Sequence, residues 1–174
     1  MSLYGLAGRG SLSPAQRVRH PSGGRDLRAI LAAVPLKLAL PADIERRLAS
    51  LGEAIQAASD AVVFAYLFGS ASTGALTPRS DVDIAIQVAP GADVHDVRLA
   101  VVRAASRHLG TDAVDVVALN TAPIALSGRI LCTRQVLVDC DPWARHRYES
   151  LHARMFQDFR IREHRILDER RARG

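Results

Sequence analysis

The chain has 174 residues, of which 48% are hydrophobic, enough apolar material for one domain with one core. Its net charge is +5, and no apolar run approaches the roughly 20 residues that a membrane-spanning helix needs. The only two cysteines, Cys132 and Cys140, are too few for a disulfide framework, and the N-terminal region has no apolar signal segment. We therefore expect a cytoplasmic protein with reduced thiols and no membrane partner.

The sequence divides into a basic, Gly- and Ser-rich segment over residues 1–24 that we expect to be poorly ordered, a domain over residues 25–141, and a long helix over residues 142–174. In chain order, the patterns predict a helix over 25–34, a helix from Pro41, strands over 61–68 and 82–88, a helix over 92–109, a strand over 113–119, a helix over 122–131, a strand over 135–138 and a helix over 142–171. This order indicates an α+β (mixed α/β) fold with a small mixed sheet of about four strands flanked by helices.

The helix that begins near Pro41 is amphipathic, because Ile44, Leu48, Leu51 and Ile55 recur at helical spacing. The final helix also carries an apolar stripe, which consists of Tyr148, Leu151, Met155, Phe159 and Ile166. Two interpretations of that stripe remain open. We expect it to pack on the body of the same chain, and the alternative is that it contacts a partner protein.

A small cluster of polar residues interrupts the apolar strands. Gly69 and Ser70 follow the strand over 61–68, and a glycine there lets a phosphate approach the backbone. Asp81 and Asp83 follow after a ten-residue spacer and, at i and i+2 of a strand, share one face. Two adjacent carboxylates repel unless a cation lies between them, and such hard oxygen ligands suit Mg²⁺ or Mn²⁺. Taken singly, each motif is also compatible with an ordinary turn or a solvent-facing edge strand.

A third acidic residue, Asp115, lies within the β-branched run over residues 113–119. Burying a carboxylate costs several kcal/mol unless it is paired or bound to a metal. If this strand lies beside the strand over 82–88, Asp115 can complete a cluster of three carboxylates. Otherwise it lies on the exposed face of a half-buried strand.

Together, Gly69-Ser70, the spacer, Asp81-x-Asp83 and the later Asp115 resemble the nucleotidyltransferase superfamily typified by DNA polymerase β. A chain this short is similar to its minimal members, the MNT-domain proteins, and the final helix resembles that of MNT antitoxins paired with HEPN toxins. The resemblance covers about residues 44–138 and implies a nucleotidyltransferase domain over residues 25–141.

The resemblance also implies a mechanism with two Mg²⁺ ions and ATP as substrate. Asp81, Asp83 and Asp115 would be the catalytic and metal-binding residues, and Gly69 and Ser70 would bind the nucleotide phosphates. AMP would pass to a hydroxyl, expected to be a tyrosine, of a HEPN toxin. Many MNT proteins have an arginine where this chain has Thr73. Arg79 is the nearest candidate to replace it in nucleotide binding.

Three alternative functions stay open at this point. The chain could adenylylate a small molecule such as an aminoglycoside, although its basic C-terminal region does not suit a cationic acceptor. It could be a non-catalytic antitoxin that acts by binding alone, as Thr73 suggests. A direct role in nucleic-acid binding rests on charge alone, because only 5% of the residues are aromatic, and we do not expect nucleic acid to be a direct partner.

Overall fold

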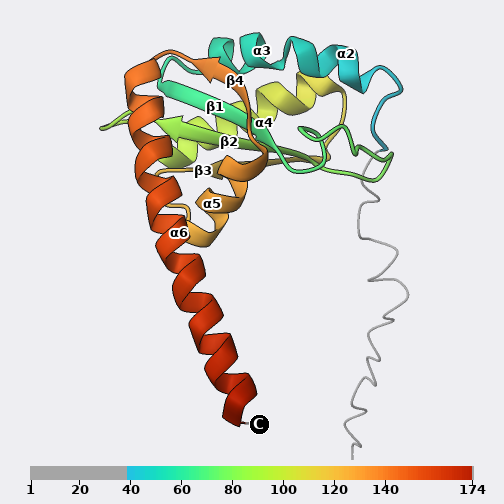
Figure 1. Ribbon diagram of the computed structural model, residues 1–174. Coiled ribbons are helices and arrows are strands. Elements are labelled where there is room, and N and C mark those ends of the chain that lie inside the picture. Colours follow the sequence, from blue (N-terminus) through green and yellow to red (C-terminus); the bar gives the residue numbers. More distant parts are fainter. Residues whose placement is uncertain (1–38, 174) are drawn as a thin grey trace, which may run out of the picture. The chain divides into compact units, whose positions relative to one another are not determined.

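The computed structural model describes residues 39–173, which belong to one compact unit, Leu36–Gly174. The segment over residues 1–24 and the helix predicted over 25–34 lie outside these described residues. The described elements are α2 (Ile44–Ala49), α3 (Leu51–Ala58), β1 (Val62–Phe68), β2 (Val82–Val88), α4 (Val94–Leu109), β3 (Val114–Ala118), α5 (Ile124–Thr133), β4 (Gln135–Asp139) and α6 (Pro142–Arg173). They confirm the predicted mixed α/β fold class (Figure 1).

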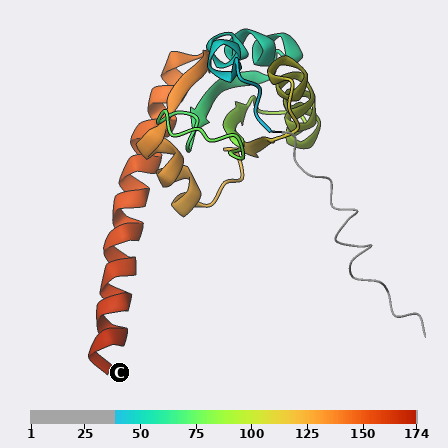
Figure 2. The ribbon, with the colours of Figure 1, turned by 90° about the vertical axis from the view of Figure 1, so that its right-hand side faces the viewer.

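The four strands form one mixed sheet in the order β3-β2-β1-β4. β1 runs antiparallel to both β2 and β4, and β2 runs parallel to β3, to which α4 connects it. Side chains alternate between the two faces of a strand. Ile84 and Ile86 of β2 therefore join the core under α3 and α4, whereas Ala85 joins the core under α5 and α6. Helices thus cover both faces of the sheet (Figures 1 and 2).

The helix predicted from Pro41 is divided into α2 and α3 at Ser50, which has φ −107° and ψ 9°. The break coincides with a contact from α4. His108 Nε2 donates to the carbonyl oxygen of Arg47 at 2.9 Å, and the backbone N–H of Ser50 also donates to it at 3.3 Å. These two donors satisfy the carbonyl at the end of α2, where helical hydrogen bonding stops.

The first half of α6 packs on α5, and this contact depends on a glycine. A Cβ added at Gly128 of α5 would lie 2.0 Å from Cγ of Phe156, so only glycine lets the ring approach this closely. Tyr148 adds a second anchor, because its hydroxyl donates to Ser127 Oγ at 3.1 Å and its ring lies 5.6 Å from that of Phe64.

The apolar stripe of α6 mostly does not pack on the chain. Leu151, Met155 and Ile166 are 50%, 46% and 52% exposed, and only Tyr148 and Phe159 are half-buried. The expectation that this stripe packs on the body of the chain is therefore wrong for those three residues. The second half of α6, which carries Ile166, runs past the end of α5 in both ribbon views (Figures 1 and 2). Leu151 and Met155 lie in the first half of α6, on a side of the helix that stays exposed.

Candidate active site

The glycine that follows β1 lies in direct contact with the second aspartate of the Asp-x-Asp motif. Gly69 has φ +68°, in the left-handed region that glycine adopts without strain. Phe68 is paired with Asp83 across β1 and β2. A Cβ on Gly69 would lie 2.4 Å from Oδ2 of Asp83, inside van der Waals contact. The structure therefore brings the Gly-Ser loop and the Asp83 carboxylate together.

Asp83 is also aligned with Asp115, since the two are register partners in the parallel pair of β2 and β3. Partners in register on neighbouring strands extend their side chains to the same face of the sheet. Asp83 is half-buried and Asp115 is exposed on the edge strand. The strand of Asp115 thus lies where the three-carboxylate hypothesis needs it.

Asp81 lies one residue before β2, and Val82 after it is tied to the neighbouring chain by its N–H, which donates to the carbonyl of Ala113 at 2.8 Å. Val82 and Ile84 are fully buried on the opposite face. This leaves Asp81 and Asp83 at alternate positions toward the face that bears Asp115.

The donor set fits a divalent cation in its chemistry. Carboxylate oxygens are the preferred ligands of Mg²⁺, and the missing Cβ of Gly69 leaves room beside Asp83. Within residues 39–173, no three His, Cys, Asp or Glu side chains are close enough together to hold a metal ion by themselves. Mg²⁺ is commonly bound by one or two carboxylates together with substrate phosphates, so this arrangement suits a cation that arrives with a nucleotide.

The loop after Gly69 is a series of turns closed by its own polar groups. The carbonyl oxygen of Gly69 accepts hydrogen bonds from Ser72 Oγ at 2.9 Å and Thr73 Oγ1 at 3.3 Å. The carbonyl of Ser70 accepts from the N–H of Ala75 at 3.0 Å. No helix begins between β1 and β2, so no helix N-terminus supplies anion donors in this loop. Thr73 serves to close the loop.

Arg79 lies at the tip of a tight turn, two residues before Asp81. The turn is held by Ser80, whose N–H donates to the carbonyl of Thr77 at 2.9 Å and whose Oγ accepts from the N–H of Thr77 at 2.9 Å. The Arg79 side chain is exposed. It is therefore a cation on the segment that carries Asp81.

A cavity of about 500 Å³ lies beside Asp115 at the edge of the sheet. His95 and Arg98 of α4 and Thr121 of the loop before α5 also line it. The sequence patterns did not indicate these residues as part of the site. The signal that could have indicated them is the parallel β2-α4-β3 connection, which brings the start of α4 beside β3.

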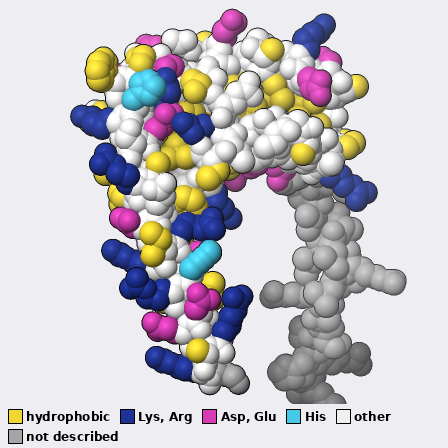
Figure 3. Space-filling model, in the orientation of Figure 1, with side chains coloured by type: hydrophobic (Ala, Val, Ile, Leu, Met, Phe, Trp, Pro, Cys, Tyr) yellow, Lys and Arg dark blue, Asp and Glu magenta, His cyan; other side chains and the backbone are white. Residues whose placement is uncertain are grey.

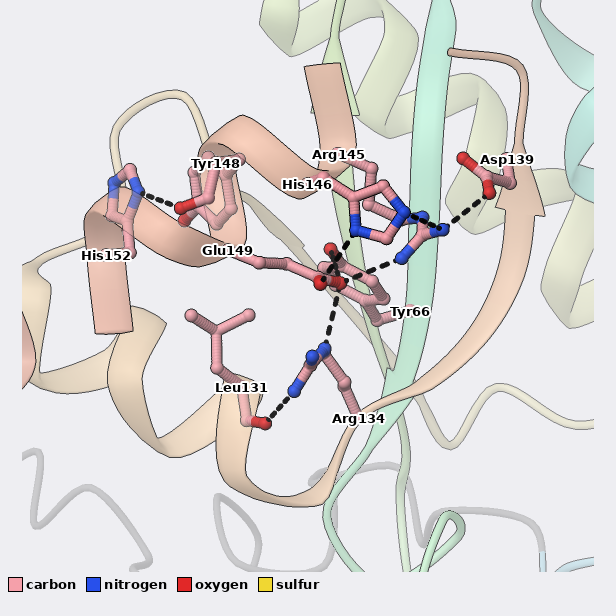
Figure 4. A network of polar contacts seen from close by, with 9 residues as sticks. All are labelled: Tyr66, Leu131, Arg134, Asp139, Arg145, His146, Tyr148, Glu149 and His152. Carbon is pink, nitrogen blue, oxygen red and sulfur yellow. Dashed lines mark hydrogen bonds and ion pairs between the residues drawn. The ribbon is translucent and has the colours of Figure 1, made fainter. Parts of the chain in front are cut away.

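Sequence reasoning also missed a polar network that joins α6 to the sheet (Figure 4). Glu149 Oε1 accepts hydrogen bonds from Tyr66 at 2.9 Å, Arg134 at 2.9 Å and Arg145 at 3.2 Å. Arg145 also forms an ion pair with Asp139 at 2.9 Å. These contacts fasten the start of α6 to β1, three residues before Gly69, and to β4.

The network changes the acid–base properties of its members. Burial by itself raises the pKa of Glu149, but the hydrogen bonds from Arg134, Tyr66 and Arg145 outweigh it and lower that pKa. Burial and the adjacent Glu149 carboxylate raise the pKa of Tyr66 well above its ordinary value. Glu149 is therefore held as a carboxylate and Tyr66 as a neutral donor.

Solved structures with a similar fold include three toxin–antitoxin assemblies. A chain of a toxin-antitoxin crystallised with AMP-PNP shares 24% identity at a TM-score of 0.57, over 72% of this chain and 96% of that one. A chain from tri-AMPylated Shewanella oneidensis HEPN toxin in complex with MNT antitoxin shares 21% identity at a TM-score of 0.55, and the match covers 72% of this chain and 96% of that one. A chain from a mutant form of the toxin-antitoxin MntA-HpeT shares 25% identity at a TM-score of 0.55, and the match covers 67% of this chain and 91% of that one.

Curated protein sequences include no significant match to this chain. Among its described helices, none combines the length and the apolar character that crossing a membrane requires. The family model described as polymerase beta, nucleotidyltransferase matches residues 53–142, more than half of the chain. That match contains Gly69, Asp83 and Asp115, which the fold brings together, and the chain belongs to the polymerase β nucleotidyltransferase family.

Proposed function

We propose that this protein is an Mg²⁺-dependent nucleotidyltransferase of the MNT antitoxin kind, which transfers AMP from ATP to a hydroxyl of a cognate HEPN toxin. The alignment of Asp83 with Asp115, with Gly69 packed against Asp83, carries the proposal. Carboxylates that can hold metal ions and a glycine loop that phosphates can approach are parts that phosphoryl transfer uses.

Asp81, Asp83 and Asp115 would hold the metal ions, which neutralise phosphate charge when bound. Gly69 and Ser70 contact the β- and γ-phosphates, and Arg79 supplies a positive charge. The acceptor oxygen forms a bond to the α-phosphorus while the bond from that phosphorus to the bridging oxygen breaks, and pyrophosphate leaves. The exposed carboxylate of Asp115 accepts the proton of the attacking hydroxyl.

The described solved structures support the choice of nucleotide and acceptor. One similar structure contains AMP-PNP, an ATP analogue, and another contains a tri-AMPylated HEPN toxin. We propose the same donor and acceptor class here, with a tyrosine as the acceptor residue. Each added AMP brings a negative charge, which would repel RNA from a toxin surface.

A labelling experiment tests the proposal. The purified chain is incubated with Mg²⁺, ATP radiolabelled at the α-phosphate and the HEPN-type protein of the adjacent reading frame. We expect label on that protein, and we expect it to be lost with Asp81→Asn and with Asp83→Asn. Label on an aminoglycoside alone would instead support a small-molecule acceptor. Toxin neutralisation that survives both substitutions would contradict catalysis as the mechanism.

A further inference from the structure

A large open groove of about 1230 Å³ runs along one face of α6, and Gly128, Leu131 and Cys132 of α5 also line it. Its floor is apolar and includes Leu131, Phe156 and Ile161. Ile161 is 60% exposed, although its side chain is wholly apolar. From Ala153 to Ala172 the groove follows about 30 Å of helix, the length of a helix of about 20 residues. Helix-in-groove recognition uses such an apolar floor.

The groove lies on the catalytic side of the sheet. Asp83 and Ala85 are at alternate positions of β2 and share a face, and Ala85 packs in the same core cluster as Ile130 and Leu131 of α5. α5 therefore covers the face that bears Asp83 and Asp115, and α6 packs on α5. A partner in the groove is on the same side of the sheet as the carboxylates.

The charges of the groove favour an acidic occupant. Glu149 is paired with Arg134, and Asp168 lies 3.7 Å from Arg171. Arg160 and Arg165 line the groove and form no ion pair with any of residues 39–173. Among the described carboxylates that line the groove, only that of Glu169 has no ion pair. Across α6, nine arginines stand against five acidic residues. Figure 3 shows basic, acidic and hydrophobic side chains interspersed along α6.

We propose that this groove docks an acidic amphipathic helix of the acceptor protein, an inference that rests on the proposed function. The chain's own segment over residues 1–38 is a poorer fit, because it has six basic residues and one acidic residue. A second copy would place one arginine-rich helix against another. RNA would meet the acidic residues of α6 and leave the apolar floor uncovered. An acidic helix with one apolar face satisfies both the floor and the arginines.

The experiment measures binding of the full chain to the HEPN-type protein of the adjacent reading frame by titration calorimetry. Two groove variants, Ile161→Asp and Arg165→Glu, have matched controls on other faces of the same helix, Ile166→Asp and Arg162→Glu. We expect each groove variant to weaken binding about tenfold or more, and each control to stay within about twofold. Equal effects of groove and control variants, or no effect of either, would overturn the docking proposal.

Further readouts identify a different occupant. A change of oligomeric state in Ile161→Asp alone would mean that a second copy fills the groove. A lower melting temperature in Ile161→Asp without partner, absent in Ile166→Asp, would mean that the chain's own segment fills it. Binding of a labelled RNA that Arg165→Glu abolishes, with no protein binding, would also overturn the proposal.

Asp83→Asn separates this inference from the proposed function. We expect this variant to bind the partner as tightly as the unchanged chain while it transfers no AMP. Suppose that the unchanged chain transfers no AMP, but that the groove variants weaken partner binding and the control variants do not. The proposed activity then fails and the docking surface stands. If transfer occurs but the groove variants bind normally, the docking surface fails and the activity stands.

Discussion

The backbone of Gly69 lies against the carboxylate of Asp83, so closely that a methyl group on the glycine would be 2.4 Å from Oδ2. We expect Gly69→Ala to displace this carboxylate and to lower the rate of AMP transfer about 100-fold, because misplacement by about 1 Å has effects of that size. The measurement is the initial rate of label transfer at saturating ATP.

Gly74 provides a matched control in the same loop. It has φ +72°, close to that of Gly69, but a Cβ there would meet nothing within 4 Å. Gly69→Ala and Gly74→Ala should therefore share a destabilisation of about 1–2 kcal/mol from the left-handed conformation. Only Gly69→Ala should lose transfer activity. An equal loss of activity in both variants would mean that strain in the loop, and not displacement of the Asp83 carboxylate, is the cause.

The contact of Gly128 with Phe156 makes a prediction about the attachment of α6. Gly128→Ala should lower the free energy of unfolding by about 1–3 kcal/mol, because the new Cβ would overlap the ring. When Phe156 is also replaced by alanine, Gly128→Ala should lower the free energy of unfolding much less than it does in the chain that retains Phe156. Additive effects in a denaturant unfolding series would mean that the two residues do not meet.

The Glu149 network makes a prediction about pH. Because its folded-state pKa is lowered, ionised Glu149 stabilises the fold above its ordinary value of 4.5, and this contribution is lost as the pH falls through the folded-state pKa. Glu149→Gln should cost about 1–3 kcal/mol at neutral pH. The difference from the unchanged chain should shrink below pH 4.5.

Glu163→Gln is the control for that experiment, since Glu163 lies on the exposed part of α6. Its effect on the free energy of unfolding should be small at every pH. A difference between Glu149→Gln and the unchanged chain that stays constant down to pH 3 would contradict the ionised network.

Metal removal should act on catalysis and not on the fold. Within the described residues no three ligands form a metal site alone, so Mg²⁺ needs the nucleotide phosphates to complete its coordination. We expect EDTA to abolish transfer and Mg²⁺ or Mn²⁺ to restore it. The melting temperature should rise with Mg²⁺ and ATP together and hardly at all with Mg²⁺ alone. A large rise with Mg²⁺ alone would indicate a preformed metal site.

Strand and helix patterns predicted most of the fold, since apolar runs and helical periodicity report burial directly. β2 begins and ends where it was predicted, at Val82 and Val88. The break at Ser50 could not be predicted, because the contact that accompanies it comes from His108, which is distant in the sequence. The exposure of Leu151 and Met155 was missed for a similar reason, since periodicity shows an apolar face but not what covers it.

The sequence proposed residues for the site but not their arrangement. The sequence left open whether the strand of Asp115 lies beside that of Asp83, and the register of β2 and β3 places the two residues as partners. The turn structure after Gly69, by contrast, depends on hydroxyl groups such as those of Ser72 and Thr73 that bond within the loop. Hydrogen bonds of this kind leave no periodic signal in the sequence.

The most direct test of the account is the transfer rate of Asp115→Asn, because Asp115 completes the carboxylate set from a separate strand. Its control is Asp60→Asn, an exposed aspartate before β1. Measured as labelled AMP on the HEPN-type acceptor, the rate should fall at least about 100-fold in Asp115→Asn. Partner binding and melting temperature should be unchanged, and Asp60→Asn should behave as the unchanged chain. A rate for Asp115→Asn within about threefold of the unchanged chain would contradict the assignment of the active site.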